Sequence, residues 1–224
     1  MTKRKTIYTI LAVVLVCCIA VAGTLAVLSA KTSDPVVNTF TSTRGIITDN
    51  GTFTLKEHIA KDQGYGDYVL TDEVTSDLVK GNSYKVLPSV DLPKDPYITI
   101  TGKTDAQAYL YVEVVDKLGD KGLSYEMADC WVKLDGVTGP NGGAVYVYTV
   151  NDTAAVIDDK TNEASLAQIY IIKDNTIKVA DEVTIAEEET LNLEFYGFMA
   201  QAAGSQHNPA TAFNSAFGGT TVGE

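Results

Sequence analysis

The sequence predicts an all-β protein, a β-sandwich or jelly roll of about eight short strands with a short C-terminal helix and an N-terminal signal helix. Short apolar runs alternate with polar residues at a period of two. Turn-forming residues separate these runs, and no long segment repeats at 3.6 residues. Strands at this spacing are typical of sandwiches and jelly rolls. Without internal repeats, the chain of 224 residues is expected to contain one β domain.

The N-terminus is expected to be an export signal. Lys3, Arg4 and Lys5 precede an uncharged apolar run at residues 6–30. A signal peptidase has small residues to cut beside at Ala22, Ala26 and Ala30. Because about 20 apolar residues suffice to cross a bilayer, an uncleaved N-terminal membrane anchor is the alternative. We therefore expect a protein secreted to the extracellular matrix or the cell surface.

The composition of the remaining chain excludes several functional classes. The leader holds three of the 17 basic residues and none of the 29 acidic ones, which leaves 14 against 29 and a net charge of −15. Such a surface repels phosphate backbones, so nucleic-acid binding is not expected. Only Cys130 follows the leader, so no intramolecular disulfide can form, and we expect it to be a small core residue.

Individual strands follow from alternation along the chain. Leu110, Val112 and Val114 share one face of a predicted strand, and Tyr109, Tyr111 and Glu113 share the other. The Asp174-Asn175 pair predicts a tight hairpin between the runs on either side of it. The predicted strands are residues 51–59, 97–101, 108–115, 130–134, 144–150, 168–172, 176–179 and 191–201.

Helical segments are few. Residues 152–167 predict a loop with a turn or two of helix, and residues 209–217 a short helix with Asn208 as its N-cap and Pro209 at its first position. The predicted organisation is a signal peptide or anchor at 1–30, a mature N-terminal segment at 31–48, a β-sandwich domain at 49–217 and a tail at 218–224.

The sequence offers no constellation that predicts catalysis. His58 and His207 lie far apart without metal-binding spacing, and His58 is expected to be a solvated or edge histidine on a strand. Nucleophile-elbow and phosphate-loop motifs do not occur in a suitable context. We therefore predict no enzyme, no cofactor, and no catalytic, cofactor-binding or metal residues.

The tyrosines suggest two interpretations. Tyr109 and Tyr111, like Tyr146 and Tyr148, recur at every second position of a strand. These faces are either half-buried under loops or a small helix, or they form an aromatic surface that binds another copy or a glycan. The second interpretation describes a surface adhesin or binding module.

Three groups of segments share a wider pattern. The first is AGTLA at 22–26 followed by VVNTFT at 36–41. The second joins FTLKEH at 53–58 to YKVLP at 84–88 and LPKDPYITI at 92–100. The third is FYGFMAQA at 195–202 with AFNSAF at 212–217. Together they resemble the TasA/camelysin family of exported Firmicute proteins, whose leaders are removed by the SipW signal peptidase.

The resemblance implies a jelly-roll protein that assembles with itself into biofilm-matrix fibres, after processing by a SipW-type peptidase and with accessory matrix proteins as further partners. Camelysin-like protease activity is a third alternative, for which the chain shows no metal-ligand motif. The Thr-rich mature N-terminus has strand propensity and few charges, so we expect it to add as a strand to a neighbouring subunit. Its apolar and central residues are Val36, Val37, Asn38, Phe40, Ile46 and Ile47.

Overall fold

The fold is all-β, as predicted. A computed structural model describes residues 29–31, 38–41, 46–75, 81–104, 106–158, 168–186, 189–202 and 208–218. The predicted signal helix, with Ala22 and Ala26, lies outside these residues, as does the predicted tail after residue 218. Among the described residues, no helix combines the length and apolar character needed to cross a membrane.

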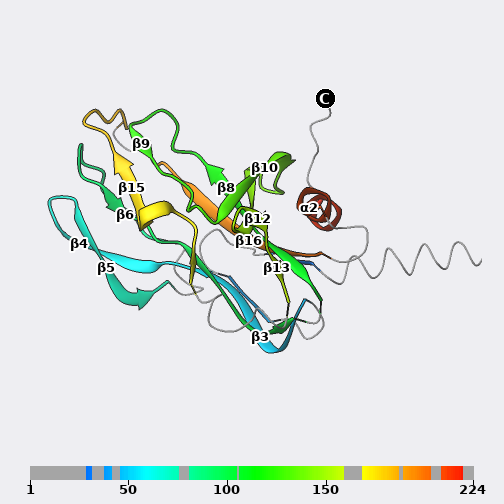
Figure 1. Ribbon diagram of the computed structural model, residues 1–224. Helices are drawn as coiled ribbons and strands as arrows, with labels where there is room; N and C mark the ends of the chain where they lie inside the picture. The colour runs from blue at the N-terminus through cyan, green and yellow to red at the C-terminus, as the bar shows by residue number, and fades with distance from the viewer. Residues whose placement is uncertain are drawn as a thin grey trace, which may run out of the picture.

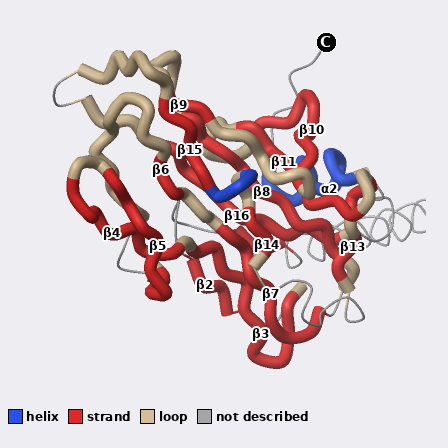
Figure 2. The backbone as a smooth tube through the Cα atoms, turned by 60° about the vertical axis from the view of Figure 1, so that its left-hand side comes forward, coloured by secondary structure: helices blue, strands red, loops and turns tan. Residues whose placement is uncertain are grey.

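Two antiparallel sheets form the body of the molecule and lie in two layers (Figures 1 and 2). The larger sheet has the order β1 (Ser29–Lys31), β16 (Leu193–Gln201), β8 (Ala108–Asp116), β11 (Ala144–Val150) and β10 (Trp131–Thr138), with β12 (Thr153–Ala154) on β11 and β13 (Val156–Ile157) on β8. The second has the order β14 (Ile169–Tyr170), β7 (Tyr97–Thr104), β3 (Ile47–Lys56) and β2 (Asn38–Thr41).

Two smaller sheets complete the fold. One joins β6 (Leu92–Pro93), β15 (Thr176–Val179) and β9 (Leu123–Ser124), and the other is the hairpin of β4 (His58–Gly64) and β5 (Asp67–Val74). Figure 1 shows this hairpin at one end of the molecule and the helix α2 (Pro209–Phe217) towards the other. The jelly-roll topology stays a prediction, because this strand order establishes only packed antiparallel sheets.

The main core lies between the two sheets, where the predicted alternation is confirmed. Phe53 and Leu55 of β3 face this core together with Leu110 and Val112 of β8, and all four are fully buried. Full burial of a large apolar side chain stabilises the fold by about 1.5–3 kcal/mol. The inner faces of the two sheets therefore supply most of the burial that holds the sandwich together.

Helix α2 covers the other face of the larger sheet and creates a second core. The ring of Phe213 packs edge-on against Tyr111 at 5.1 Å and against Phe198 at 5.4 Å between centroids. The predicted start of this helix is confirmed, because the Asn208 side chain accepts hydrogen bonds from the backbone N–H groups of residues 210 and 211. Gly218 ends the helix in a left-handed conformation.

One local prediction is wrong. Asp174 and Asn175 do not close a hairpin, since β14 before them pairs with β7 and β15 after them pairs with β6 and β9. These residues instead form the 3-10 turn η1 (Lys173–Asn175), which carries the chain from one sheet to another. Residues 152–158 contain the short strands β12 and β13, and the rest of the segment predicted as a loop with a turn or two of helix, 159–167, lies outside the described residues.

A buried carboxylate organises the turn between β10 and β11. Glu113 of β8 is fully buried, and its oxygens accept hydrogen bonds from the Asn141 backbone (2.8 Å) and side chain (2.9 Å) and from the Gly143 backbone (2.8 Å). A Cβ on Gly139 would lie 2.2 Å from the Glu113 carboxyl carbon. Glycine at this position therefore lets the turn close over the carboxylate.

We predict that Glu113→Gln destabilises the protein by about 2 kcal/mol, because the amide keeps one oxygen for the two backbone N–H groups but places an NH2 group against the Asn141 side-chain donor. The free energy of unfolding in urea measures the effect. The matched control is Glu194→Gln, a partly exposed residue paired with Lys117, for which we expect a change within about 0.5 kcal/mol. Equal effects of the two substitutions would contradict the role given to Glu113.

Candidate assembly site

The start of the described chain forms one edge of the larger sheet. β1 pairs antiparallel with β16, with Ser29 opposite Ala200, Ala30 opposite Met199 and Lys31 opposite Phe198. Ala30, one of the three predicted cleavage positions, thus lies in a paired strand. The β16 edge, which would otherwise present unpaired backbone groups, is covered here by this short strand.

The next described segment forms one edge of the second sheet. β2 pairs antiparallel with β3, with Asn38 opposite Leu55 and Phe40 opposite Phe53. Val36 and Val37 lie outside the described residues. The N-terminal region therefore contributes an edge strand to each layer of the sandwich.

Ile46 and Ile47 occupy a different position from the rest of the predicted assembly segment. Both are buried in the core between the sheets, with exposures of 2% and 4%. Ile47 begins β3, so the predicted boundary between residues 48 and 49 falls inside this strand. The two isoleucines belong to the folded body, whereas Asn38 and Phe40 belong to an edge strand.

The four tyrosines do not form one exposed face. Tyr109 and Tyr111 have exposures of only 5% and 0% and lie in the core that α2 covers. Tyr146 and Tyr148 are half-buried against the core between the sheets, on the opposite side of the larger sheet. Tyr109 and Tyr111 consequently pack the fold and present no binding surface in this structure, in agreement with the buried interpretation.

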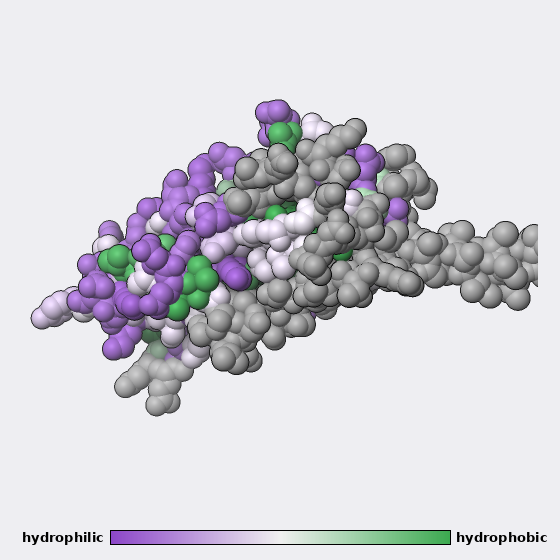
Figure 3. Space-filling view, turned by 90° about the horizontal axis from the view of Figure 1, so that it is seen from below, coloured by the Kyte–Doolittle hydropathy of each residue, from purple (hydrophilic) through white to green (hydrophobic). Residues whose placement is uncertain are grey.

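The hairpin of β4 and β5 presents a different aromatic side chain. Tyr65 is 98% exposed at its tip, between two glycines, and all three residues have positive φ angles. Val69 and Val74 of β5 are exposed as well. Figure 3 shows a mainly hydrophilic described surface at this end of the molecule, with small apolar groups among the polar ones.

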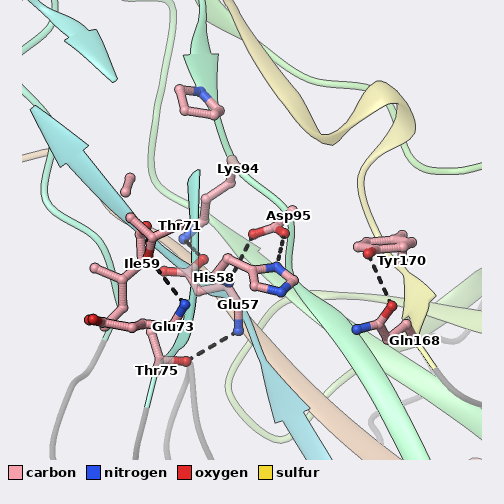
Figure 4. A network of polar contacts seen from close by, with 12 residues as sticks. Glu57, His58, Ile59, Thr71, Glu73, Thr75, Lys94, Asp95, Gln168 and Tyr170 are labelled. Atoms are coloured by element: carbon pink, nitrogen blue, oxygen red, sulfur yellow. Dashed lines mark hydrogen bonds and ion pairs between the residues drawn. The ribbon is translucent and has the colours of Figure 1, made fainter. Parts of the chain in front are cut away.

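A buried polar network joins the base of this hairpin to the start of β7 (Figure 4). Glu57 lies between β3 and β4, is fully buried, and binds the Lys94 ammonium through Oε2 at 2.5 Å. The next residue, His58, is held by Asp95, whose Oδ2 lies 2.5 Å from Nδ1 and whose Oδ1 accepts the His58 backbone N–H at 3.0 Å. His58 thus lies on β4, an edge strand of a two-stranded sheet, with its side chain 21% exposed and its ring held by a buried carboxylate.

Burial raises the pKa values of two groups at this network, Asp95 and Tyr84. Burial raises the pKa of the Asp95 carboxyl, although its hydrogen bonds from His58 act in the opposite direction. Burial also raises the pKa of Tyr84, with the Glu57 and Asp95 carboxylates adding to the rise. The Tyr84 hydroxyl donates to the Pro93 carbonyl at 2.5 Å, so it acts as a structural donor.

The remaining chemical candidates are dispersed. Within the described ranges, His, Cys, Asp and Glu side chains form no group of three or more that could hold a metal ion. His207 lies outside those ranges. Cys130 is half-buried against the main core, and burial raises the pKa of its thiol, which lowers its thiolate fraction and its reactivity.

Two open surface grooves lie among the described residues. One lies between β9 and β15 and includes the exposed Asp91–Lys178 ion pair at 2.7 Å. The other follows the turn between β10 and β11, next to the Glu113 carboxylate. Neither groove brings together groups that would form a catalytic constellation.

The chain matches no protein-family model, no curated protein and no solved structure. The resemblance to the TasA/camelysin family therefore rests on the sequence segments alone and stays a prediction.

The buried network was not predicted from the sequence, although the sequence carries one signal of it. Glu57 follows Phe53 and Leu55 at the same alternation, so its position predicts a residue that faces the core. Glu113 is similarly in step with Tyr109 and Tyr111. A carboxylate that falls at the same every-second-residue positions as core residues indicates a buried group with a polar partner. Asn82 lies in a loop, where no such periodicity marks it.

We predict that the contribution of Asp95 to stability falls as pH rises. Its raised pKa means that the folded state holds the proton more tightly than the unfolded state does, so stability is lost from the ordinary value of 3.8 upwards through the folded pKa. The difference in unfolding free energy between wild type and Asp95→Asn should therefore decrease over that window.

Asp91 provides a control of opposite sign. Its hydrogen bond from Lys178 lowers the pKa of the Asp91 carboxyl, so its contribution is present above 3.8 and is lost as pH falls through the folded value. The difference between wild type and Asp91→Asn should accordingly increase with pH. Parallel trends for the two pairs of proteins would contradict the assignment.

Proposed function

We propose that this protein is a secreted structural subunit that assembles with its own kind at the cell surface or in an extracellular matrix, by exchange of its N-terminal strand β2. The observation that carries the proposal is that β2, which lies after the predicted leader, occupies the edge of the second sheet beside β3. The leader pattern supports export, and the similarity to the TasA/camelysin segments supports a matrix role.

A sheet edge can bind a strand of its own chain or the same strand of a neighbouring chain through the same backbone hydrogen bonds. An edge strand near the start of a chain is connected to the body at one end, so a neighbour's copy can make the same backbone hydrogen bonds. Exchange then replaces each lost contact with an identical one. If each subunit donates its segment to the next, the contact is head-to-tail and does not close, which produces a fibre.

The charge distribution agrees with a specific contact. A net charge of −15 after removal of the leader opposes unspecific association between copies. β2 (NTFT) contains no charged residue, so it can enter a neighbouring sheet edge without bringing a charge there. Assembly would therefore depend on strand pairing rather than on attraction between surfaces, with a SipW-type peptidase releasing the segment.

We predict that a mature form without residues 31–45 remains folded but builds no large particles. Ile46 and Ile47 are retained, so the core between the sheets keeps its residues, whereas the donor strand is removed. Analytical ultracentrifugation and electron microscopy of the form starting at Lys31 and of the truncated form make the comparison. Fibres of normal appearance from the truncated form would refute the proposal.

Single substitutions separate strand pairing from segment length. Phe40→Pro lies within β2 and removes one backbone donor, so it should reduce assembly at least tenfold. Ser42→Pro, just after β2, is the matched control and should assemble like the unchanged form. A synthetic peptide of residues 31–45 should bind the truncated protein and raise its melting temperature, and a scrambled peptide should not.

A further inference from the structure

One buried carboxylate holds both an amine and a carboxamide. Glu57, fully buried, has Lys94 Nζ at 2.5 Å from Oε2 and Asn82 Nδ2 at 3.0 Å from Oε1. The Lys94 side chain is only 7% exposed. Figure 4 shows Lys94 and Glu57 approaching each other next to the His58–Asp95 pair. An amine and an amide are thus held side by side on one proton acceptor.

The hydrogen bonds of Asn82 fix the orientation of its carboxamide. Its Oδ1 accepts the Ala60 backbone N–H at 2.8 Å, and its Nδ2 donates both to Glu57 and to the His58 carbonyl at 2.7 Å. Exchanging the amide oxygen and nitrogen would place a donor against the Ala60 N–H and an acceptor against the His58 carbonyl. The carbonyl is therefore polarised by a backbone donor, and the amide nitrogen faces Glu57.

We propose that Lys94 and Asn82 join in an intramolecular isopeptide bond, with Glu57 carrying the protons. Glu57 first takes a proton from the Lys94 ammonium, and the free amine attacks the Asn82 Cγ. The new Nζ–Cγ bond pushes electrons onto Oδ1, where the Ala60 N–H stabilises the negative charge.

The second half of the reaction releases ammonia. Glu57 gives its proton to the Asn82 amide nitrogen and takes one from Nζ, the Cγ–Nδ2 bond breaks, and the carbonyl forms again. The products are one secondary amide, one molecule of ammonia and a protonated Glu57, so atoms and charge balance. No oxidant, reductant or co-reactant is required.

Burial favours this reaction over a permanent ion pair. Two charges inside a protein lose the solvation that water would give them, and their attraction recovers this loss only in part. The reaction replaces both charges with neutral, hydrogen-bonded groups. The reaction also gives the chain a covalent cross-link. Because a single cysteine remains after the leader, the chain forms no intramolecular disulfide that could serve this purpose.

The bond would close a covalent loop between the base of the β4–β5 hairpin and the start of β7. It joins Asn82, which contacts the first residues of β4, to Lys94, which directly precedes Asp95 and the start of β7. The intervening residues include β6 and Tyr84. The base of the β4–β5 hairpin would thereby be tied covalently to the body of the sandwich.

Peptide mapping of the purified, unheated mature protein tests the proposal. The intact mass should fall below the sequence mass by about 17 Da, the mass of ammonia. Trypsin should release a branched peptide in which residues 81–85 are joined to 86–103 through Lys94, because trypsin does not cut after an acylated lysine. Separate unmodified peptides 81–85, 86–94 and 95–103 would overturn it.

Variants identify the groups that carry the reaction. Glu57→Gln and Lys94→Arg should abolish the branched peptide, and Glu113→Gln, at a buried carboxylate outside this network, should leave it unchanged. Ring closure at Asn50-Gly51 or Asn141-Gly142 also releases ammonia, so only the branched peptide counts as support. If the Glu57 and Lys94 variants fail to fold, the wild-type peptide map alone decides.

Discussion

The burial of β8 on both faces is the constraint on which the rest of the structure depends. From Ala108 to Val115 every residue of this strand is buried. One face requires the second sheet as a cover, and the other requires α2 and the turn that Glu113 holds. β16 pairs with one side of it from Ala108 to Asp116, and the other side pairs with β11 at residues 111–114 and with β13 at residues 108–109. Both layers and the C-terminal helix follow from the need to cover this strand.

Once both faces of β8 are covered, the strands at the sheet edges are the parts of the fold that can be exchanged between chains. Strands near the start of the chain occupy one edge of each layer, and they are linked to the body through β3. Pairing at these edges is made by backbone hydrogen bonds, and the same bonds can form within a chain or between chains. The buried network at Glu57 and Lys94 lies just after β3, next to the residues of β3 that pair with β2.

Alternation along the chain was sufficient to predict the all-β class, most of the long strands and the capped helix at Asn208. It could not predict the partners of each strand, because pairing depends on long-range packing. The error at Asp174-Asn175 illustrates this, since a turn signal does not say whether the chain returns to the same sheet. The polar network depends on Asn82 and Lys94, which lie in loops, where no periodicity marks a buried residue. The β4–β5 hairpin was not predicted either, because its charged strands lack a clear apolar alternation.

The most direct test of strand exchange is a disulfide placed across β2 and β3. Thr41 lies opposite Thr52 in the register of these strands, so Thr41→Cys with Thr52→Cys in a Cys130→Ser background can report which chain supplies β2. Oxidation after assembly should give a ladder of covalent oligomers on a denaturing gel. Assemblies that yield only monomers with an internal disulfide would show that each chain keeps its own strand, which would contradict the account.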